Sequence, residues 1–248
     1  NGEFKNTLQR GDGVEEVMHI LQKLTFTEAD ADQTYSFTLA ERQDTIPGVT
    51  NDPNQYTVTI AVRDNGDGTL DAVTKVWQGE TELASADTAA GDYAPVKVSF
   101  VNNYKAQSVS VGVNDGLRGT KTLWGRDSLE NETFDFTLEP TGDTVQAVAD
   151  GKVTMGDTAA SVANLTEGEA ETFGFGNITI NQAGTYTFQV KEVLPEGVTA
   201  DSPVKNGVTY DTGTAAYTIF VRDNTVTGRL EATVTAINEN FENTYEAT

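Results

Sequence analysis

Alternation of apolar with polar residues, recurring through most of the chain, is the feature that most restricts its fold. Residues 34–41 read TYSFTLAE and residues 185–192 read TYTFQVKE. In both runs, every second position holds an aromatic, an aromatic, an aliphatic residue and then a glutamate. Side chains two residues apart on a β-strand lie on the same face. Such runs, bounded by Gly, Asn and Asp, are typical of short half-buried strands joined by tight turns. The pattern predicts an all-β protein; only residues 14–21 have roughly helical apolar spacing, which strands would explain equally well.

Internal similarity divides the chain into two modules. Three segments of the first half match three of the second in the same order: 34–41 with 185–192, 56–72 with 217–232, and 99–106 with 240–247. Ordered recurrence of this kind indicates two copies of one domain. We expect one module at 1–105 and a second at 106–248.

The first module is expected to be incomplete at its N-terminus. Upstream of its 185–192 strand, the second module has KTLWGRD at 121–127 and FDFTL at 134–138. The first module has only GEFKNTL at 2–8, which corresponds to the 134–138 strand. The strand equivalent to 121–127 would therefore precede residue 1.

Each module also places two polar side chains on an otherwise apolar strand face. Glu41 and Glu192 end the alternating runs, and Asn102 and Asn243 each lie between aromatic residues in an F-x-N-x-Y pattern. A carboxamide buried without a hydrogen-bond partner costs roughly 2–7 kcal/mol. Because the same pair recurs in both modules, we interpret it as chemistry rather than chance.

Lys121 completes the set in the second module, since it shares a strand face with Leu123. Burial disfavours the charged forms of lysine and glutamate alike. If Lys121 meets Glu192 and Asn243 in the core, the neutral amine can attack the side-chain carbonyl carbon of Asn243. Protonated Glu192 would hydrogen-bond the carbonyl oxygen and pass protons towards the departing ammonia. The product would be a Lys121–Asn243 amide, formed once per molecule without a cofactor.

The ordered motifs K-x-L-x-G-R-D, F-x-F-x-L, G-T-Y-x-F-x-x-x-E and F-x-N-x-Y resemble the streptococcal pilin isopeptide-linkage repeat of the FctA type. The resemblance covers nearly all of the second module and the later two-thirds of the first. It implies two tandem Ig-like (CnaB-like) β-sandwiches of a Gram-positive surface protein, with self-formed Lys–Asn bonds promoted by a glutamate. It assigns Lys121 and Asn243 to the bond, Glu192 to its catalysis, and Glu41 and Asn102 to the matching positions of the first module.

No lysine of the first module is expected to complete its set. Lys5, Lys23 and Lys97 each alternate with the apolar residues beside them and so point away from the core face. We expect no internal crosslink in this module, because the strand that would carry its lysine lies upstream. Donation of that strand by a neighbouring chain is the alternative.

Composition narrows the classes of partner. The 38 acidic and 16 basic side chains give a net charge of −22, which argues against binding to nucleic acid or to anionic membranes. Cysteine is absent, which excludes disulfides and thiol chemistry. The chain has no apolar run of transmembrane length, and we recognise no signal-sequence pattern in its first residues. We expect a segment of a longer extracellular, cell-wall-anchored protein, with its anchor and neighbouring domains outside this segment.

The combined prediction is a structural, non-enzymatic stalk or pilin-like segment. One alternative is an adhesive module that binds a host protein or glycan through residues 75–95, which the second module lacks. Another is a carbohydrate-active accessory domain that uses Trp77 and Trp124. Residues 64–68 (DNGDG) resemble a calcium loop but fit a hairpin turn better, and we expect no metal.

Overall fold

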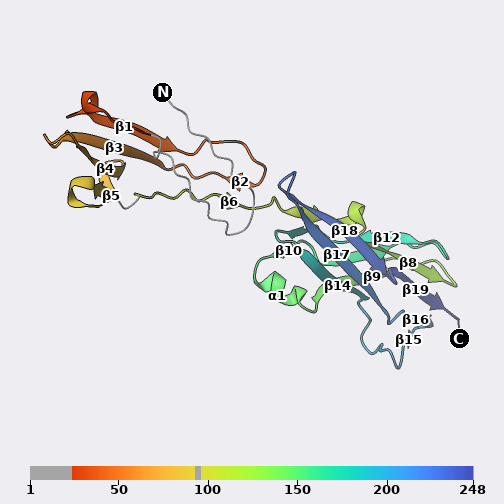
Figure 1. Cartoon of the computed structure of the whole chain (residues 1–248). Helices are drawn as coiled ribbons and strands as arrows, with labels where there is room; N and C mark the ends of the chain where they lie inside the picture. The colour runs from red at the N-terminus through yellow and green to blue at the C-terminus, as the bar shows by residue number, and fades with distance from the viewer. Residues whose placement is uncertain (1–23, 93–95, 248) are drawn as a thin grey trace. The chain divides into compact units, whose positions relative to one another are not determined.

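The computed structural model describes residues 24–92 and 96–247 of this chain (Figure 1). They fall into two compact units, the first formed by residues up to Asp44 with Asn51–Asn102, the second by Thr45–Thr50 with the chain from Asn103 onwards. The predictions for residues 14–21, Lys5 and Lys23 lie outside the described residues.

The first unit is built on a four-stranded antiparallel sheet in the order β1-β3-β4-β5. Its strands are β1 (Thr34–Ala40), β3 (Gln55–Asp64), β4 (Leu70–Gln78) and β5 (Thr81–Asp87), with short 3-10 turns at Glu28–Asp30 and Thr88–Ala90. Side chains of β3 alternate between buried and half-buried along most of the strand, as the sequence pattern predicts. Tyr56, Val58 and Val76 form its core, against which Phe37 and Phe100 pack from β1 and from an extended segment.

The DNGDG segment forms the turn between β3 and β4. The Asp64 side chain accepts a hydrogen bond from the N–H of Gly66 at 2.8 Å, and the Asp67 side chain accepts one from the N–H of Thr69 at 3.0 Å. Gly66 and Gly68 have φ values of 72° and 87°, in the left-handed region that glycine enters without a Cβ penalty. The carboxylates therefore bind the turn's own backbone. Within the described residues, no group of three or more His, Asp or Glu is arranged to hold a metal ion.

The second unit contains two five-stranded sheets. The first, in the order β11-β9-β14-β17-β18, consists of β11 (Ala159–Ala163), β9 (Thr133–Thr141), β14 (Gly184–Glu192), β17 (Thr214–Asn224) and β18 (Arg229–Ile237). The second, in the order β12-β8-β19-β16-β15, consists of β12 (Glu171–Gly174), β8 (Arg118–Trp124), β19 (Asn240–Tyr245), β16 (Val208–Thr209) and β15 (Val204–Lys205). Every pairing in these sheets is antiparallel except that of β8 with β19, which is parallel.

Smaller elements complete this unit. They are a three-stranded sheet of β10 (Val153–Met155), β13 (Ile178–Ile180) and β7 (Val109–Val111), a pair of β2 (Val49–Thr50) with β6 (Asn103–Tyr104), a 3-10 turn at Val113–Asp115 and the helix α1 (Thr144–Ala149). The sequence pattern did not predict α1, because six residues are too few to establish a helical period. Its first residue, Thr144, is buried and accepts a hydrogen bond from the N–H of Thr187 on β14. No helix in the described part of the chain is long and apolar enough to cross a membrane.

Contacts between aromatic side chains join the two large sheets into one core. Phe136 of β9 stacks on Phe173 of β12 with ring centroids 3.8 Å apart, and Phe241 of β19 lies 5.1 Å from Phe136. Tyr217 of β17 reaches across the core, where its hydroxyl donates to the carbonyl oxygen of Arg118 on β8 at 2.7 Å. Burial raises the pKa of Tyr217 to about 12, because a phenolate would lack hydration there.

Candidate functional site: a buried Lys–Glu–Asn cluster

The two large sheets of the second unit supply the three predicted site residues. Lys121 lies on β8 and Asn243 on the neighbouring parallel strand β19, where Leu123 is the register partner of Asn243. Lys121 is two residues before Leu123, so its side chain shares the face of Asn243. Glu192 is the last residue of β14, in the facing sheet. The sequence-predicted set therefore meets between the layers.

The carboxyl group of Glu192 bridges the other two side chains. Nζ of Lys121 donates to Oε2 of Glu192 at 2.7 Å, and Nδ2 of Asn243 donates to Oε1 at 2.8 Å. Lys121 and Asn243 are both 0% exposed and Glu192 is 6% exposed. One carboxyl thus contacts both an amine and a carboxamide in a dry interior.

The carbonyl oxygen of Asn243 has a different partner from the one the sequence led us to expect. Oδ1 accepts from the backbone N–H of Asp211 at 2.7 Å. We predicted that Glu192 would hydrogen-bond this oxygen, and the structure contradicts that detail. The reason is geometric: the two oxygens of Glu192 are taken by Nζ and Nδ2, which turns Oδ1 towards the segment before β17.

Burial changes the protonation of the pair. It lowers the pKa of Lys121, an effect that the charge of Glu192 and its hydrogen bond oppose. It raises the pKa of Glu192, which the charge and hydrogen bond of Lys121 oppose in turn. The amine also lies 5.0 Å from the ring centroid of buried Phe134. Desolvation is the largest cause of both shifts, so burial acts towards the neutral amine and the protonated carboxyl.

The first unit brings its corresponding residues together as well. Nδ2 of Asn102 donates to Oε1 of Glu41 at 2.5 Å, and the backbone N–H of Asp52 donates to Oδ1 of Asn102 at 2.8 Å. However, Asn102 is exposed and Glu41 only half-buried. The expectation of a buried polar pair is therefore wrong for this unit, in which none of the described strands pairs with residues 100–102. Lys97 is exposed, in agreement with its predicted outward face.

Residues proposed for ligand binding lie elsewhere. Part of the 75–95 segment pairs in the sheet as β5, and Trp77 donates its ring N–H to Thr59 at 3.3 Å. Trp124 is 44% exposed, and its ring lies so close to Gly168 that a Cβ there would approach it to 2.9 Å.

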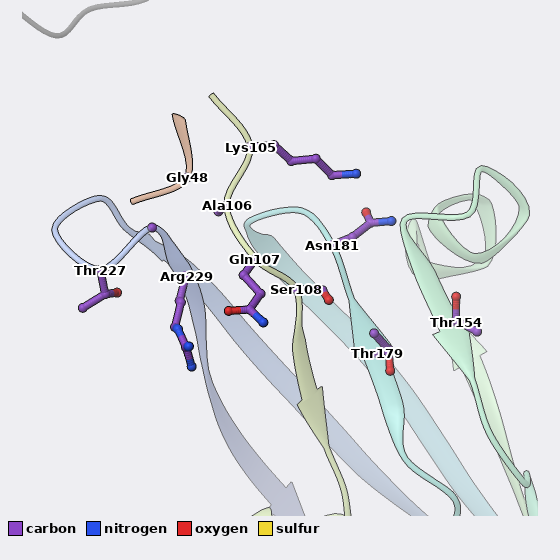
Figure 2. A pocket seen from close by; sticks show the side chains of 11 residues that line it. Gly48, Lys105, Ala106, Gln107, Ser108, Thr154, Thr179, Asn181, Thr227 and Arg229 are labelled. Carbon is purple, nitrogen blue, oxygen red and sulfur yellow. The ribbon is translucent and has the colours of Figure 1, made fainter. Parts of the chain in front are cut away.

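The second unit also has a hollow of about 640 Å³ (Figure 2). It is lined by Gly48, polar side chains such as Ser108 and Thr179, and the cations Lys105 and Arg229. No residue of the Lys–Glu–Asn cluster lines it.

Sequence reasoning missed Asp211 and Asp52, whose backbone N–H groups hold the two asparagine side chains. Each aspartate lies three residues before a strand, β17 or β3. The signal was present as D-x-G and D-x-N just upstream of these strands. Asp52 lies four residues before Tyr56, whereas Asp211 lies six residues before Tyr217. This difference of two residues hides the pattern when the two modules are aligned on their strands.

Comparison with known proteins supports the resemblance that the motifs indicated. The profile of FctA, described as the Spy0128-like isopeptide containing domain, matches residues 2–105 and 117–246. No curated protein matches the chain. Similar solved structures include the major pilin T3.2 of Streptococcus pyogenes, with 17% identity over 90% of this chain and 69% of that chain at a TM-score of 0.25. The T-13 major pilin of the same species has 15% identity over 91% of this chain and 70% of its own at a TM-score of 0.24.

The FctA match covers both units and most of the sequence. The prediction of an all-β chain with tandem β-sandwich domains is confirmed. The chain belongs to the FctA family of isopeptide-containing pilin domains.

Proposed function

We propose that this chain is a structural, pilin-like segment of a longer Gram-positive cell-surface protein, whose second unit is locked by a self-formed amide bond between Lys121 and Asn243. Family membership supports the structural role. The observation that carries the bond is the position of Glu192, which contacts the amine of Lys121 and the carboxamide nitrogen of Asn243 at hydrogen-bond distance in a dry core.

The contacts suit a balanced condensation. The lone pair of neutral Nζ attacks Cγ of Asn243, and negative charge develops on Oδ1, which accepts from the N–H of Asp211. Oε2 of Glu192 takes a proton from Nζ while Oε1 delivers a proton to Nδ2. The Cγ–Nδ2 bond breaks and ammonia leaves. Glu192 ends in its starting protonation state, and no oxidant, metal or nucleotide is consumed.

Packing supplies much of the activation. Holding reactants in a productive geometry can contribute about 7–11 kcal/mol to lowering a barrier. Here the amine and the carboxamide share one strand face on neighbouring strands, and a single carboxyl contacts both. Folding of the core therefore holds the two reacting groups close together and in a fixed orientation.

The topology gives the bond a mechanical role. β8 lies near the start of the second unit and β19 ends it, and the two are adjacent parallel strands. Tension along the chain would shear their hydrogen-bond ladder. An amide between their side chains would carry that load covalently, as a segment of a surface fibre requires in a chain without cysteine.

Intact-protein mass spectrometry tests the bond. The folded chain is expected to weigh one ammonia less than its formula, and Lys121→Met or Glu192→Gln should restore the full mass. Glu41→Gln, the same change at the matching position of the first unit, serves as a control and should keep the loss. A parent protein of full formula mass would refute the bond, and a loss of two ammonias would refute our expectation that the first unit forms none.

A further inference from the structure

A clamp centred on Asp211 fixes the side chain that would be attacked. The N–H of Asp211 donates to Oδ1 of Asn243 at 2.7 Å. Oδ1 of the Asp211 side chain accepts from the N–H of Gly213 at 2.8 Å, which forms a tight turn just before β17. Oδ2 accepts from the N–H of Glu242 at 3.3 Å, the residue before Asn243. One aspartate thus ties its own turn to β19 and points its backbone donor at the reacting carboxamide.

The same clamp recurs in the first unit among different neighbours. The N–H of Asp52 donates to Oδ1 of Asn102 at 2.8 Å, and its side chain accepts from the N–H of Asn54 and of Val101, each at 2.8 Å. Val101 precedes Asn102 as Glu242 precedes Asn243. The contacts are therefore retained although the intervening residue is Pro53 in one unit and Thr212 in the other.

We infer that Asp211 is a positioning residue for amide formation, acting through its own backbone N–H; this inference rests on the proposed function. The N–H holds Oδ1 where negative charge develops during attack, and it fixes the orientation of the carboxamide. With Oδ1 held, Nδ2 faces Oε1 of Glu192, which must protonate the leaving nitrogen. A carboxamide rotated by half a turn would present its oxygen to Glu192 and turn the leaving nitrogen away from its acid.

The side chain of Asp211 supplies the rigidity of this donor. Without the hydrogen bonds that the Asp211 carboxylate accepts from Gly213 and Glu242, the turn before β17 is no longer held against β19. The backbone N–H of Asp211 is then free to move away from Oδ1 of Asn243. In enzymes that stabilise an oxyanion, removing one such donor costs about 10²–10³-fold in rate. Since Asp211→Ala loosens the donor but does not delete it, we expect amide formation to slow by roughly 10- to 100-fold.

The experiment follows the reaction in the full chain. Parent, Asp211→Ala and Asp211→Asn chains are made by a short pulse of cell-free synthesis, translation is stopped, and samples quenched in acid at intervals are weighed intact. Asparagine retains one side-chain oxygen, so it can keep the bond from Gly213 but not both bonds. We expect ammonia loss to be fastest in the parent, slower in Asp211→Asn and slowest in Asp211→Ala.

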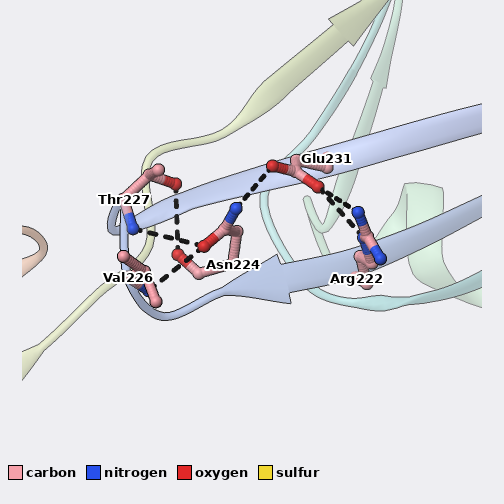
Figure 3. A network of polar contacts seen from close by, with 5 residues as sticks. All are labelled: Arg222, Asn224, Val226, Thr227 and Glu231. Carbon is pink, nitrogen blue, oxygen red and sulfur yellow. Dashed lines mark hydrogen bonds and ion pairs between the residues drawn. The ribbon is translucent and has the colours of Figure 1, made fainter.

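Asn224→Ala is the matched control (Figure 3). The Asn224 side chain also closes a turn, accepting from the N–H groups of Val226 and Thr227, while it donates to Glu231. Asn224 is the last residue of the eleven-residue strand β17, which spans roughly 35 Å, whereas Asp211 lies just before the first. This change should leave the rate at the parent value.

The outcomes separate this inference from the proposed function. If the parent chain keeps its ammonia, both the proposed bond and the positioning role of Asp211 are refuted. If the parent loses ammonia and Asp211→Ala loses it equally fast, only the positioning role is refuted. Stability measured with Lys121→Met added, so that no bond can form, reports any structural cost of each change. If both Asp211 variants are slowed equally and in proportion to that cost, Asp211 is only a structural clamp and the inference is overturned.

Discussion

Glu192→Gln should lower the thermal stability of the second unit by an amount set by the length of chain that the amide closes. A Lys121–Asn243 bond encloses a loop of 122 residues, the difference between the two positions. By the chain-entropy relation used for disulfides, such a loop removes unfolded-state entropy worth about 5 kcal/mol at 25 °C. For a domain of this size, 1 kcal/mol shifts the melting temperature by roughly 2–4 °C, so the expected loss is about 10–20 °C.

Glutamine is the appropriate substitution because it has the volume of glutamate and retains one acceptor and one donor towards Nδ2 and Nζ. It cannot relay a proton, so the unreacted side chains remain in place. Differential scanning calorimetry of the full chain, with intact mass measured on the same sample, gives both readouts. Glu41→Gln should change neither the mass nor the transition of the second unit.

Two results would refute this reasoning. Loss of ammonia from Glu192→Gln at the parent rate would show that the carboxyl is not the proton relay. A variant without the bond that melts at the parent temperature would show that closing the loop contributes little to the stability of the folded unit.

Two further predictions concern protonation. A plot of the rate of ammonia loss against pH should be bell-shaped, because the reactive state needs a neutral amine and a protonated carboxyl. Acid adds a proton to Lys121 and base removes one from Glu192, so the rate falls on both sides. A rate that rises steadily with pH would contradict this. The raised pKa of Tyr217 means that its contribution to stability is complete below pH 10 and is lost as pH rises through about 12. Tyr217→Phe should cost about 1–3 kcal/mol near neutral pH by leaving the Arg118 carbonyl unpaired, and denaturant titrations should show a weaker alkaline loss than in the parent.

Much of the site could be predicted because strand periodicity assigns each side chain to a face. Lys121, Glu192 and Asn243 were selected as polar residues on apolar faces, and all three are buried together between the two large sheets. The proposed condensation then follows from the groups that these residues carry, which are an amine, a carboxyl and a carboxamide. The pairing of β8 with β19 could not be predicted, because parallel neighbours so distant in sequence are chosen by tertiary packing rather than by any local signal.

The Asp211 contact escaped prediction for a different reason. Its donor is a backbone N–H, which every residue except proline carries, so the residue type does not reveal the contact. The D-x-G and D-x-N patterns that mark the two turns are offset between the modules, which hides them from self-comparison. The exposure of Asn102 in the first unit was also unpredictable from its F-x-N-x-Y pattern, which is shared with Asn243. Alternation states which face a residue occupies, whereas burial depends on whether another strand covers that face.

Comparison of the two units leads to an expectation about the order in which the reactive set assembles. In the first unit the glutamate, the asparagine and the aspartate N–H already make the contacts seen in the second, although no lysine from the described residues joins them. In the second unit the amine lies on β8, which pairs with β19. We expect this pairing to form late in folding, because it joins segments about 120 residues apart and its loop-closure entropy must be overcome first. On this expectation the proposed amide would form after folding, and it would preserve a native core that non-covalent packing has already selected.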